Sequence, residues 1–269
     1  MTHPFPSLLD GLVVAAVALV AGADGPTAVR LGVAMTLLQA SIGTLNDLVD
    51  APRDAVSKPA KPIPAGLVSR SVAWAVVVGG GGLGVVLALG SGAATGLLAV
   101  VVLAIGYGYD LVAKGTVWSW LPFAIGIPLL PVFGWLGATG GLAPRFALLI
   151  PVAVVAGAAL AIANARADAE RDVSAGIDSI AVRLGLERSW TVHAVLLAVV
   201  LGAAIVTVVA SGASTAAQAG VVGASLVVTV GAWLGRHADR SRRERSWEME
   251  AVGVALLAAA WLAGVPLDR

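Results

Sequence analysis

Long apolar stretches alternate with short polar segments along the whole chain. A helix needs about 20 mainly apolar residues to cross the hydrocarbon core of a bilayer. Nine stretches meet or approach that length, and turn-forming residues such as Asp24-Gly25-Pro26 separate them. The pattern predicts an all-α, polytopic membrane protein whose transmembrane helices lie near residues 7–23, 28–47, 70–90, 93–110, 118–138, 145–166, 188–210, 214–235 and 247–265.

Composition agrees with this pattern and narrows the class of protein. Hydrophobic residues make up 58% of the 269 residues and charged residues only 12%, a balance that a water-soluble domain cannot use. The formal net charge is +1, and no basic block with interleaved aromatic residues indicates nucleic-acid binding. Cysteine is absent, which excludes disulfides, thiolate metal sites and cysteine nucleophiles. We expect residues 1–269 to form a single membrane domain.

The positions of the basic residues predict the orientation of the chain. Of the 17 lysines and arginines, all but Arg30, Arg145 and Arg269 fall in one of the two alternating sets of loops. By the positive-inside rule, the long loops and the N-terminus are cytoplasmic. The segment before the first span lacks the basic residues of a signal peptide, so that span is interpreted as a membrane helix. The arginine-rich segment 236–245 is interpreted as a solvated loop that faces lipid headgroups, outside any site.

Ionisable residues gather at the cytoplasmic end of the second span. Asn46, Asp50 and Asp54 step by four and are expected on one helix face, with Asp47 pointing about 100° away from Asn46. Pro52 disfavours helix at this point, so Asp54 lies either on helix or on unwound chain.

The sixth span ends with the same spacing in Asn164, Asp168 and Asp172. Carboxylates without histidine or cysteine suit Mg2+, which takes one or two carboxylates plus water and substrate phosphates. Either cluster alone is compatible with a solvated helix end or with ion pairing. Two copies on one membrane face favour a site in which bridging metals hold a diphosphate.

Cations and aromatic residues follow these clusters. Lys58 and Lys61 lie in a proline-rich loop, where a phosphate would find positive charge. Lys114 is explained by diphosphate contact or by charge anchoring at the membrane. Tyr107 and Tyr109 either stabilise a carbocation with their ring faces or anchor a helix at the interface. Asp110 orients Lys114 or an acceptor, or forms a simple ion pair.

These residues resemble the signatures of the UbiA superfamily of intramembrane prenyltransferases, N-D-x-x-D-x-x-x-D and a later D-x-x-x-D. Here they run from Asn46 to Asp54 and from Asp168 to Asp172. The resemblance includes the loop K-P-x-x-P-I-P-x-G, the segment Y-x-Y-D-L-x-x-K-G-T and the run from Gly176 to Gly185, and it covers essentially the whole chain. It implies nine helices around a central cavity that opens laterally to lipid and is capped by cytoplasmic loops.

The resemblance also implies the chemistry. Two Mg2+ ions and an isoprenyl diphosphate would be held by Asn46, Asp50, Asp54, Asp168 and Asp172. The allylic C–O bond would ionise, and a lipophilic acceptor such as an aromatic ring, a quinone precursor or a glycerol phosphate lipid would capture the carbocation. We expect catalytic roles for Asp50, Asp54, Asp168, Asp172 and Lys114, and substrate contacts for Asn46, Lys58, Lys61, Tyr107, Tyr109, Asp110, Asn164 and Arg183.

Two other functions compete with prenyl transfer. A membrane terpene cyclase on the same scaffold would ionise the same donor, but the carbocation would be captured by the donor's own double bonds. A secondary transporter is less favoured, because its carboxylates are expected near the bilayer midplane beside broken helices. The sequence leaves the length of the prenyl chain, the acceptor and the oligomeric state open.

Overall fold

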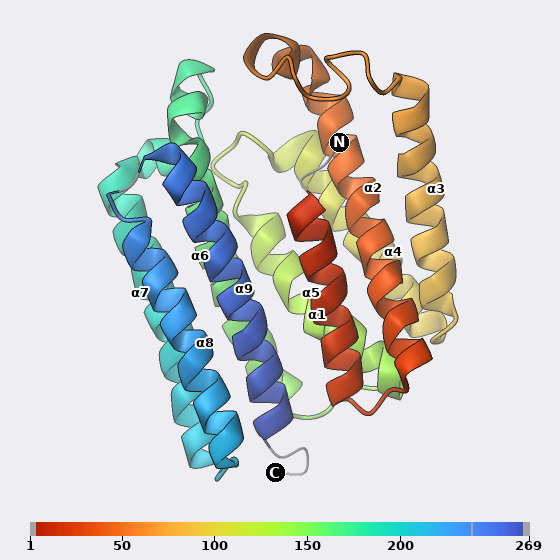
Figure 1. The fold of residues 1–269 in the computed structure, drawn as a ribbon, viewed down its shortest axis with the longest axis vertical. Helices are drawn as coiled ribbons and strands as arrows, with labels where there is room; N and C mark the ends of the chain where they lie inside the picture. Colours follow the sequence, from red (N-terminus) through yellow and green to blue (C-terminus); the bar gives the residue numbers. More distant parts are fainter. Residues whose placement is uncertain (1–3, 238, 266–269) are drawn as a thin grey trace. The chain divides into compact units, whose positions relative to one another are not determined.

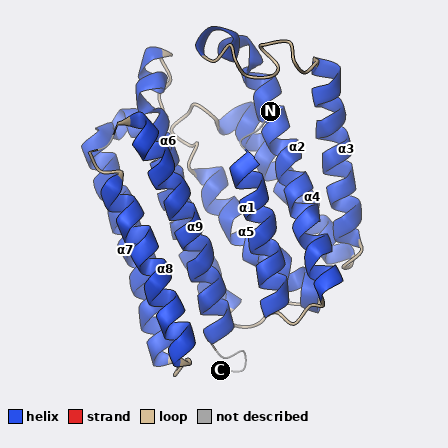
Figure 2. Cartoon of the chain, viewed as in Figure 1, coloured by secondary structure: helices blue, strands red, loops and turns tan. Residues whose placement is uncertain are grey.

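The computed structural model describes residues 4–237 and 239–265, and this part of the chain consists of helices joined by short loops, without a strand (Figures 1 and 2). The prediction of an all-α fold is therefore confirmed. In chain order the elements are α1 Pro4–Val20, α2 Gly25–Ser57, α3 Arg70–Leu89, α4 Ala93–Gly108, the π-helical turn η1 Tyr109–Ala113, α5 Leu121–Thr139, α6 Phe146–Ser174, α7 Ile180–Ala210, α8 Thr215–Leu234 and α9 Arg240–Gly264.

The helices have the length and surface of membrane spans. Eight of those in the described residues are long and apolar enough to cross a membrane, and α1, with 17 residues, is shorter. Large apolar side chains such as Leu12, Leu97 and Trp233 are more than half exposed along them. Such surfaces are incompatible with water and suit lipid contact. The chain is a multi-pass membrane protein.

Several helix boundaries differ from the expected spans. Helix α2 continues to Ser57 rather than ending near residue 47, and α6 continues to Ser174 rather than to residue 166. Hydropathy marks only the part of a helix inside hydrocarbon, whereas backbone hydrogen bonds continue into water. Pro52 does not end α2: the Lys58 amide donates a 2.7 Å hydrogen bond to the Asp54 carbonyl, so Asp54 lies on helix.

Two glycines with positive φ end or interrupt helices in the second half of the chain. Helix α6 ends in a Schellman motif, in which the Ile177 amide donates to the Asp172 carbonyl at 2.8 Å and the Gly176 amide to the Val173 carbonyl at 3.2 Å. The motif requires a left-handed residue, and Gly176 has φ 66°. Helix α7 begins at Ile180 rather than near residue 188. Gly185, with φ 73°, separates its first turn from the rest of the helix.

The chain divides into two compact units. The first contains residues up to Val112 and the segment Leu129–Leu142, and the second contains Ala113–Pro128 and the chain from Ala143 onward. In the first unit α2 packs between α1 and α3. Its close approach to α3 depends on glycine, because a Cβ at Gly84 would lie 2.8 Å from Leu38 Cδ2 and 3.1 Å from the Ala34 carbonyl oxygen.

The second unit is built from α6 to α9 and the first turns of α5. Ala159, Leu197, Val228 and Ala232 form its apolar core, from α6, α7 and α8. At one end, the buried Arg145 guanidinium donates to the carbonyl oxygens of Leu262 and Val265. These carbonyls have no partner within α9, so Arg145 satisfies the C-terminus of that helix.

A glycine at the contact between α5 and α6 gives a test of this packing. A Cβ at Gly157 would lie 2.5 Å from the Phe123 carbonyl oxygen and 2.9 Å from Ala124 Cα, both backbone atoms. We predict that Gly157→Ala lowers the free energy of unfolding by about 1–3 kcal/mol, because backbone cannot move aside cheaply. Gly202→Ala is the matched control, since a Cβ at Gly202 meets nothing within 4 Å. Thermal unfolding in detergent micelles measures both, and equal melting temperatures would contradict the packing described.

Candidate functional site

The first acidic motif lies on the last turns of α2, above an apolar cluster of the first unit. Leu45 and Leu48 of α2 pack with Ala73 and Val77 of α3, and Ile63 and Val68 of the connecting loop pack against them. The loop also bonds to itself, with the Ala65 amide donating to the Lys61 carbonyl at 2.8 Å. Apolar anchoring and internal hydrogen bonds therefore hold Lys61 over the motif.

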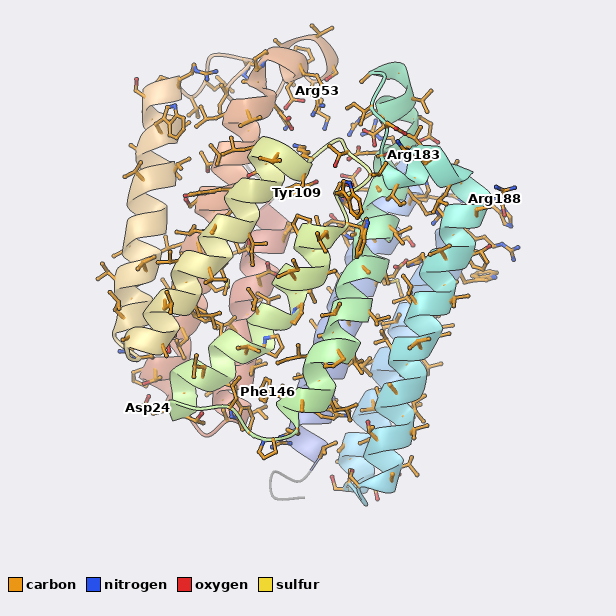
Figure 3. All side chains as sticks on the ribbon, turned by 180° about the vertical axis from the view of Figure 1, so that it is seen from behind. Asp24, Arg53, Tyr109, Phe146, Arg183 and Arg188 are labelled. Atoms are coloured by element: carbon orange, nitrogen blue, oxygen red, sulfur yellow. The ribbon has the colours of Figure 1, made fainter. Side chains whose placement is uncertain are left out.

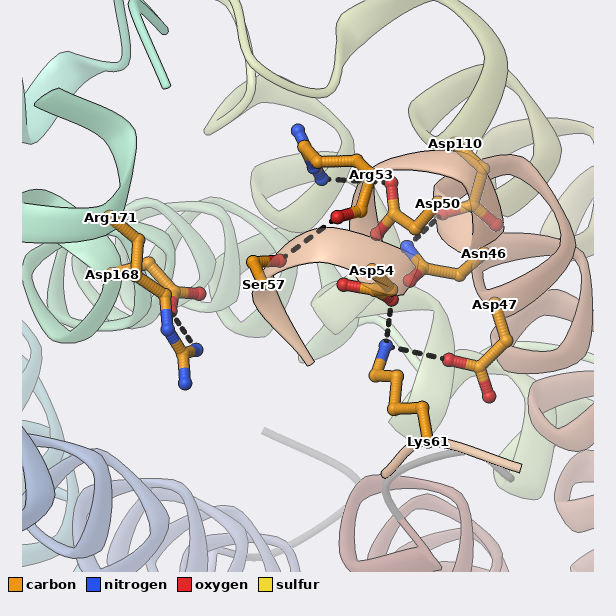
Figure 4. Close-up of polar contacts among 10 residues, drawn as sticks. All are labelled: Asn46, Asp47, Asp50, Arg53, Asp54, Ser57, Lys61, Asp110, Asp168 and Arg171. Carbon is orange, nitrogen blue, oxygen red and sulfur yellow. Dashed lines mark hydrogen bonds and ion pairs between the residues drawn. The ribbon is translucent and has the colours of Figure 1, made fainter. Parts of the chain in front are cut away.

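Lys61 lies between two carboxylates of the motif. Its Nζ is 2.9 Å from Asp47 Oδ1 and 2.7 Å from Asp54 Oδ2 (Figure 4). Asp47 and Asp54 are only 6% and 3% exposed. Burial by itself lowers the pKa of Lys61, but the hydrogen bonds to Asp54 and Asp47 outweigh it and raise the pKa above its ordinary value. Lys61 is therefore a charged counterion for both residues.

The expected common face of Asn46, Asp50 and Asp54 was wrong for Asp54, and helical geometry gives the reason. At about 100° per residue, eight residues turn the direction by about 80°, so Asp54 drifts away from Asn46. A step of seven residues brings the side-chain direction back to within about 20° of its start, which places Asp47 and Asp54 on one face. The residue that the sequence analysis left outside the site, Asp47, shares the partner of Asp54.

The other two members of the motif have partners of their own. Asp50 accepts a 2.8 Å hydrogen bond from Arg53 Nη2, one turn along α2. Asn46 donates a 2.7 Å hydrogen bond from Nδ2 to Oδ1 of Asp110, which is buried in the turn η1 (Figure 4). The expected convergence of Asn46, Asp50 and Asp54 is thus replaced by three separate contacts. The contact with Asn46 adds a partner to those considered for Asp110.

The Tyr107 hydroxyl is hydrogen-bonded to a neighbouring helix. The buried Ser41 hydroxyl lies 2.6 Å from the Val77 carbonyl oxygen, to which it donates, and 2.7 Å from the Tyr107 hydroxyl. Because the serine proton is used, the phenol donates to Ser41. Tyr109, labelled in Figure 3, is partly buried at the start of η1.

The second motif lies on the last turns of α6, in the second unit. Asp168 accepts a 2.8 Å hydrogen bond from Arg171 Nη1, and its side chain is 45% exposed. Asn164 and Asp172 are partly exposed on the same stretch of helix. The i, i+3 pairing with arginine repeats that of Asp50 with Arg53 in the first motif.

The remaining predicted cations lie outside the helices' apolar stretches. Lys58 and Lys114 are partly exposed, the first after α2 and the second after η1. Arg183 pairs with Asp178, whose Oδ2 lies 2.8 Å from Nε and 2.6 Å from Nη2 (Figure 3 labels Arg183). This hydrogen bonding holds the pKa of Asp178 below its ordinary value.

Sequence analysis missed a buried polar network in the second unit. Arg243 is 5% exposed and pairs with Glu170, which lies between Asp168 and Asp172 in the sequence. The interpretation of segment 236–245 as a solvated loop was therefore wrong for Arg243. His193 and Glu250, also buried, lie 2.6 Å apart between α7 and α9. For His193 a signal was available beforehand, because it is an ionisable residue within an apolar stretch.

The donor set at both motifs fits a hard divalent cation. Within residues 4–237 and 239–265, no three histidine, cysteine, aspartate or glutamate side chains lie close enough to hold a metal between them. Mg2+ needs fewer than three protein ligands, because it takes one or two carboxylates and completes its coordination shell with water and phosphate oxygens. The Lys61 ammonium between Asp47 and Asp54 marks a position where this chain already holds a cation between two carboxylates.

Comparisons with known proteins agree with this chemistry. A sequence model described as the UbiA prenyltransferase family matches residues 8–263. Chlorophyll synthases of Avena sativa and Oryza sativa subsp. japonica are 30% and 31% identical over 156 residues, which are 54% of this chain and 41% of theirs. The match thus spans about two fifths of the length of these relatives.

The fold is shared with solved structures. A UbiA homolog from Aeropyrum pernix has a TM-score of 0.78 at 20% identity, covering 97% of this chain and 98% of that one. A homolog from Archaeoglobus fulgidus, bound to GPP and Mg2+, has a TM-score of 0.68 at 19% identity, covering 96% and 99%.

Competition between Lys61 and Mg2+ can be measured without any substrate. We predict that Lys61→Met lowers the free energy of unfolding in EDTA by about 1–3 kcal/mol, because two buried carboxylates lose their shared partner. Mg2+ then raises the melting temperature of this variant more than that of the wild type. Lys61→Arg, which keeps the charge, is the control and stays close to wild type. Equal Mg2+ shifts in the wild type and Lys61→Met would contradict a cation site between Asp47 and Asp54.

Proposed function

The chain belongs to the UbiA prenyltransferase family and is thus an enzyme of prenyl transfer, and we propose that it moves a prenyl group from an isoprenyl diphosphate to a lipophilic acceptor in a Mg2+-dependent reaction. The observation that carries the proposal is the first motif, where Asp47 and Asp54 bracket a cation beside Asp50 on α2. The homolog bound to GPP and Mg2+ supports the choice of donor and metal.

Oxygen-bearing side chains of the two motifs are the proposed metal ligands. We assign Mg2+, as two ions, to Asn46, Asp50, Asp54, Asp168 and Asp172. Their carboxylate and amide oxygens are the donors that Mg2+ prefers. When bound, the metal supplies positive charge to the oxygens of the leaving diphosphate. Asp50 and Asp168 are paired with Arg53 and Arg171. In the proposed reaction each arginine leaves its carboxylate when the metal binds.

Lysine and arginine side chains would share the diphosphate charge. Lys61 is held over the first motif by its loop and stays protonated because its pKa is raised. Lys58, Lys114 and Arg183 are the other proposed contacts. Loss of diphosphate breaks the allylic C–O bond, the acceptor supplies the electron pair of the new bond, and a proton leaves the acceptor. The ring faces of Tyr107 and Tyr109 are suited to the transient carbocation.

The membrane defines the partners and the orientation. The apolar exposed surface supports the bilayer as the environment of the protein and of both lipophilic substrates. The distribution of lysine and arginine supports a cytoplasmic N-terminus and a cytoplasmic active site. The family match over residues 8–263 supports one prenyltransferase domain extending over the whole chain. Similarity to chlorophyll synthases adds a chlorophyll precursor to the aromatic, quinone-precursor and glycerol phosphate lipid acceptors considered.

A turnover assay tests the proposal. Purified protein is incubated with prenyl diphosphates of graded chain length, with and without an acceptor panel, while diphosphate release and lipid products are followed. We predict release that requires Mg2+ and an acceptor. Asp50→Asn and Asp168→Asn each lower the rate at least about 100-fold, because each removes a charged ligand from the ionisation step. Glu187→Gln is the control, since its side chain is 68% exposed on α7, and it keeps the wild-type rate.

The outcomes separate the functions. Release without acceptor that yields a hydrocarbon or terpene alcohol would assign the protein as a membrane terpene cyclase instead. Full activity of both aspartate variants would contradict the roles of the two motifs.

A further inference from the structure

The last turns of α6 carry polar residues on two opposite faces. Asp168 and Asp172 of the second motif lie within about 40° of each other around the helix, and Arg166 and Glu170 alternate with them in the sequence. At about 100° per residue, a step of two residues points about 160° away. A contact that holds the face of Arg166 and Glu170 therefore fixes the direction of the opposite face.

Arg243, in the first turns of α9, makes such a contact. Its Nε donates a 2.9 Å hydrogen bond to the carbonyl oxygen of Arg166, and its Nη2 lies 2.5 Å from both carboxylate oxygens of Glu170. The Arg243 side chain is 5% exposed, whereas that of Glu170 is 54% exposed. A buried guanidinium without partners is strongly unfavourable, so these contacts are not the optional pairing of a solvated surface.

Arg166 adds a second connection on the same face. Its side chain is buried and donates to three carbonyl oxygens, those of Leu186 at 3.4 Å, Gly235 at 3.4 Å and Arg236 at 3.2 Å. Leu186 follows the break in α7, and Gly235 and Arg236 follow α8. The face opposite the second motif is thus tied to α7, to the end of α8 and to α9.

The end of α6 needs such a contact because it projects from its unit. Figure 1 shows the last turns of α6 extending beyond the adjacent ends of α7 and α9. Residues 173–176 are exposed there. The ion pair of Asp168 with Arg171 lies within the same helix, so it turns with the helix and does not fix its direction. Glu170, near this end of α6, is fastened to another element, α9.

We propose that Arg243 is a positioning residue for the second motif: by clamping Glu170 and the Arg166 carbonyl, it sets the direction in which Asp168 and Asp172 present their carboxylates to the metal. The inference rests on the proposed function, which assigns these aspartates to Mg2+. Arg243 itself contacts neither metal nor substrate in this role and acts through α6.

Two measurements on the full-length protein test the role of Arg243. The first is direct binding of Mn2+, followed by electron paramagnetic resonance, and the second is the Mg2+ concentration that gives half-maximal diphosphate release. Removing an outer partner of a metal ligand costs about 10–100-fold in metal affinity. We expect Arg243→Gln and Glu170→Gln each to weaken Mn2+ binding and to raise the half-saturating Mg2+ concentration at least about tenfold.

Further variants separate positioning from folding. The double variant should be no worse than either single one, because both remove the same interaction. Arg243→Lys, which keeps the charge but loses the Nε donor, should be intermediate. Arg245→Gln is the matched control, since Arg245 is exposed two residues further along α9, and it should match wild type. Saturating Mg2+ should restore the maximal rate of Arg243→Gln, whereas a loss of folded protein would not be restored.

The results that overturn the proposal differ from those that overturn the function. An unchanged half-saturating Mg2+ concentration and unchanged Mn2+ binding in Arg243→Gln, with only a lower melting temperature, would reduce Arg243 to a folding role. Absence of turnover in the wild type with every donor and acceptor would remove the proposed function. Weaker Mn2+ binding in Arg243→Gln would still support positioning of a metal site in that case.

Discussion

The cost of leaving a charged group unpaired in an apolar environment is the constraint on which this structure depends. Several buried ionisable groups are accordingly joined to another ionisable side chain or to backbone carbonyls. Lys61 joins Asp47 and Asp54, Arg243 joins Glu170, and His193 lies against Glu250. Arg145 and Arg166 satisfy carbonyl groups at helix ends. Each contact ties one helix to another or to a loop, so the polar residues determine where the helix ends lie.

The same constraint prepares both motifs for a cation. Carboxylates near the end of an apolar helix require positive charge, and this chain supplies it from Lys61, Arg53 and Arg171. In the proposed function, a metal ion takes the place of these side chains. Asp110 is fixed differently, by an amide hydrogen bond from Asn46.

Sequence predicted the helices well because the hydrocarbon core imposes a length and an apolar surface on each span. It predicted the ends of α2 and α6 poorly, because hydropathy carries no information about a helix that continues into water. The paired motifs were recognisable from spacing, but the shared face of Asp47 and Asp54 was not. Two steps of four residues suggested that Asp54 stays in line with Asn46, whereas eight residues turn the direction by about 80°. The contact between Arg243 and Glu170 joins residues 73 positions apart. Only packing brings such residues together, so spacing gave no signal.

The most direct test of the proposal that the two motifs bind metal is anomalous scattering from crystals grown with Mn2+ and a non-hydrolysable prenyl thiolodiphosphate. We predict anomalous peaks within coordination distance of carboxylate oxygens at Asp50 and Asp54 and at Asp168 and Asp172, with Lys61 withdrawn from Asp54 toward the diphosphate. Peaks at other side chains, or a bound donor whose diphosphate lies away from both motifs, would contradict the account.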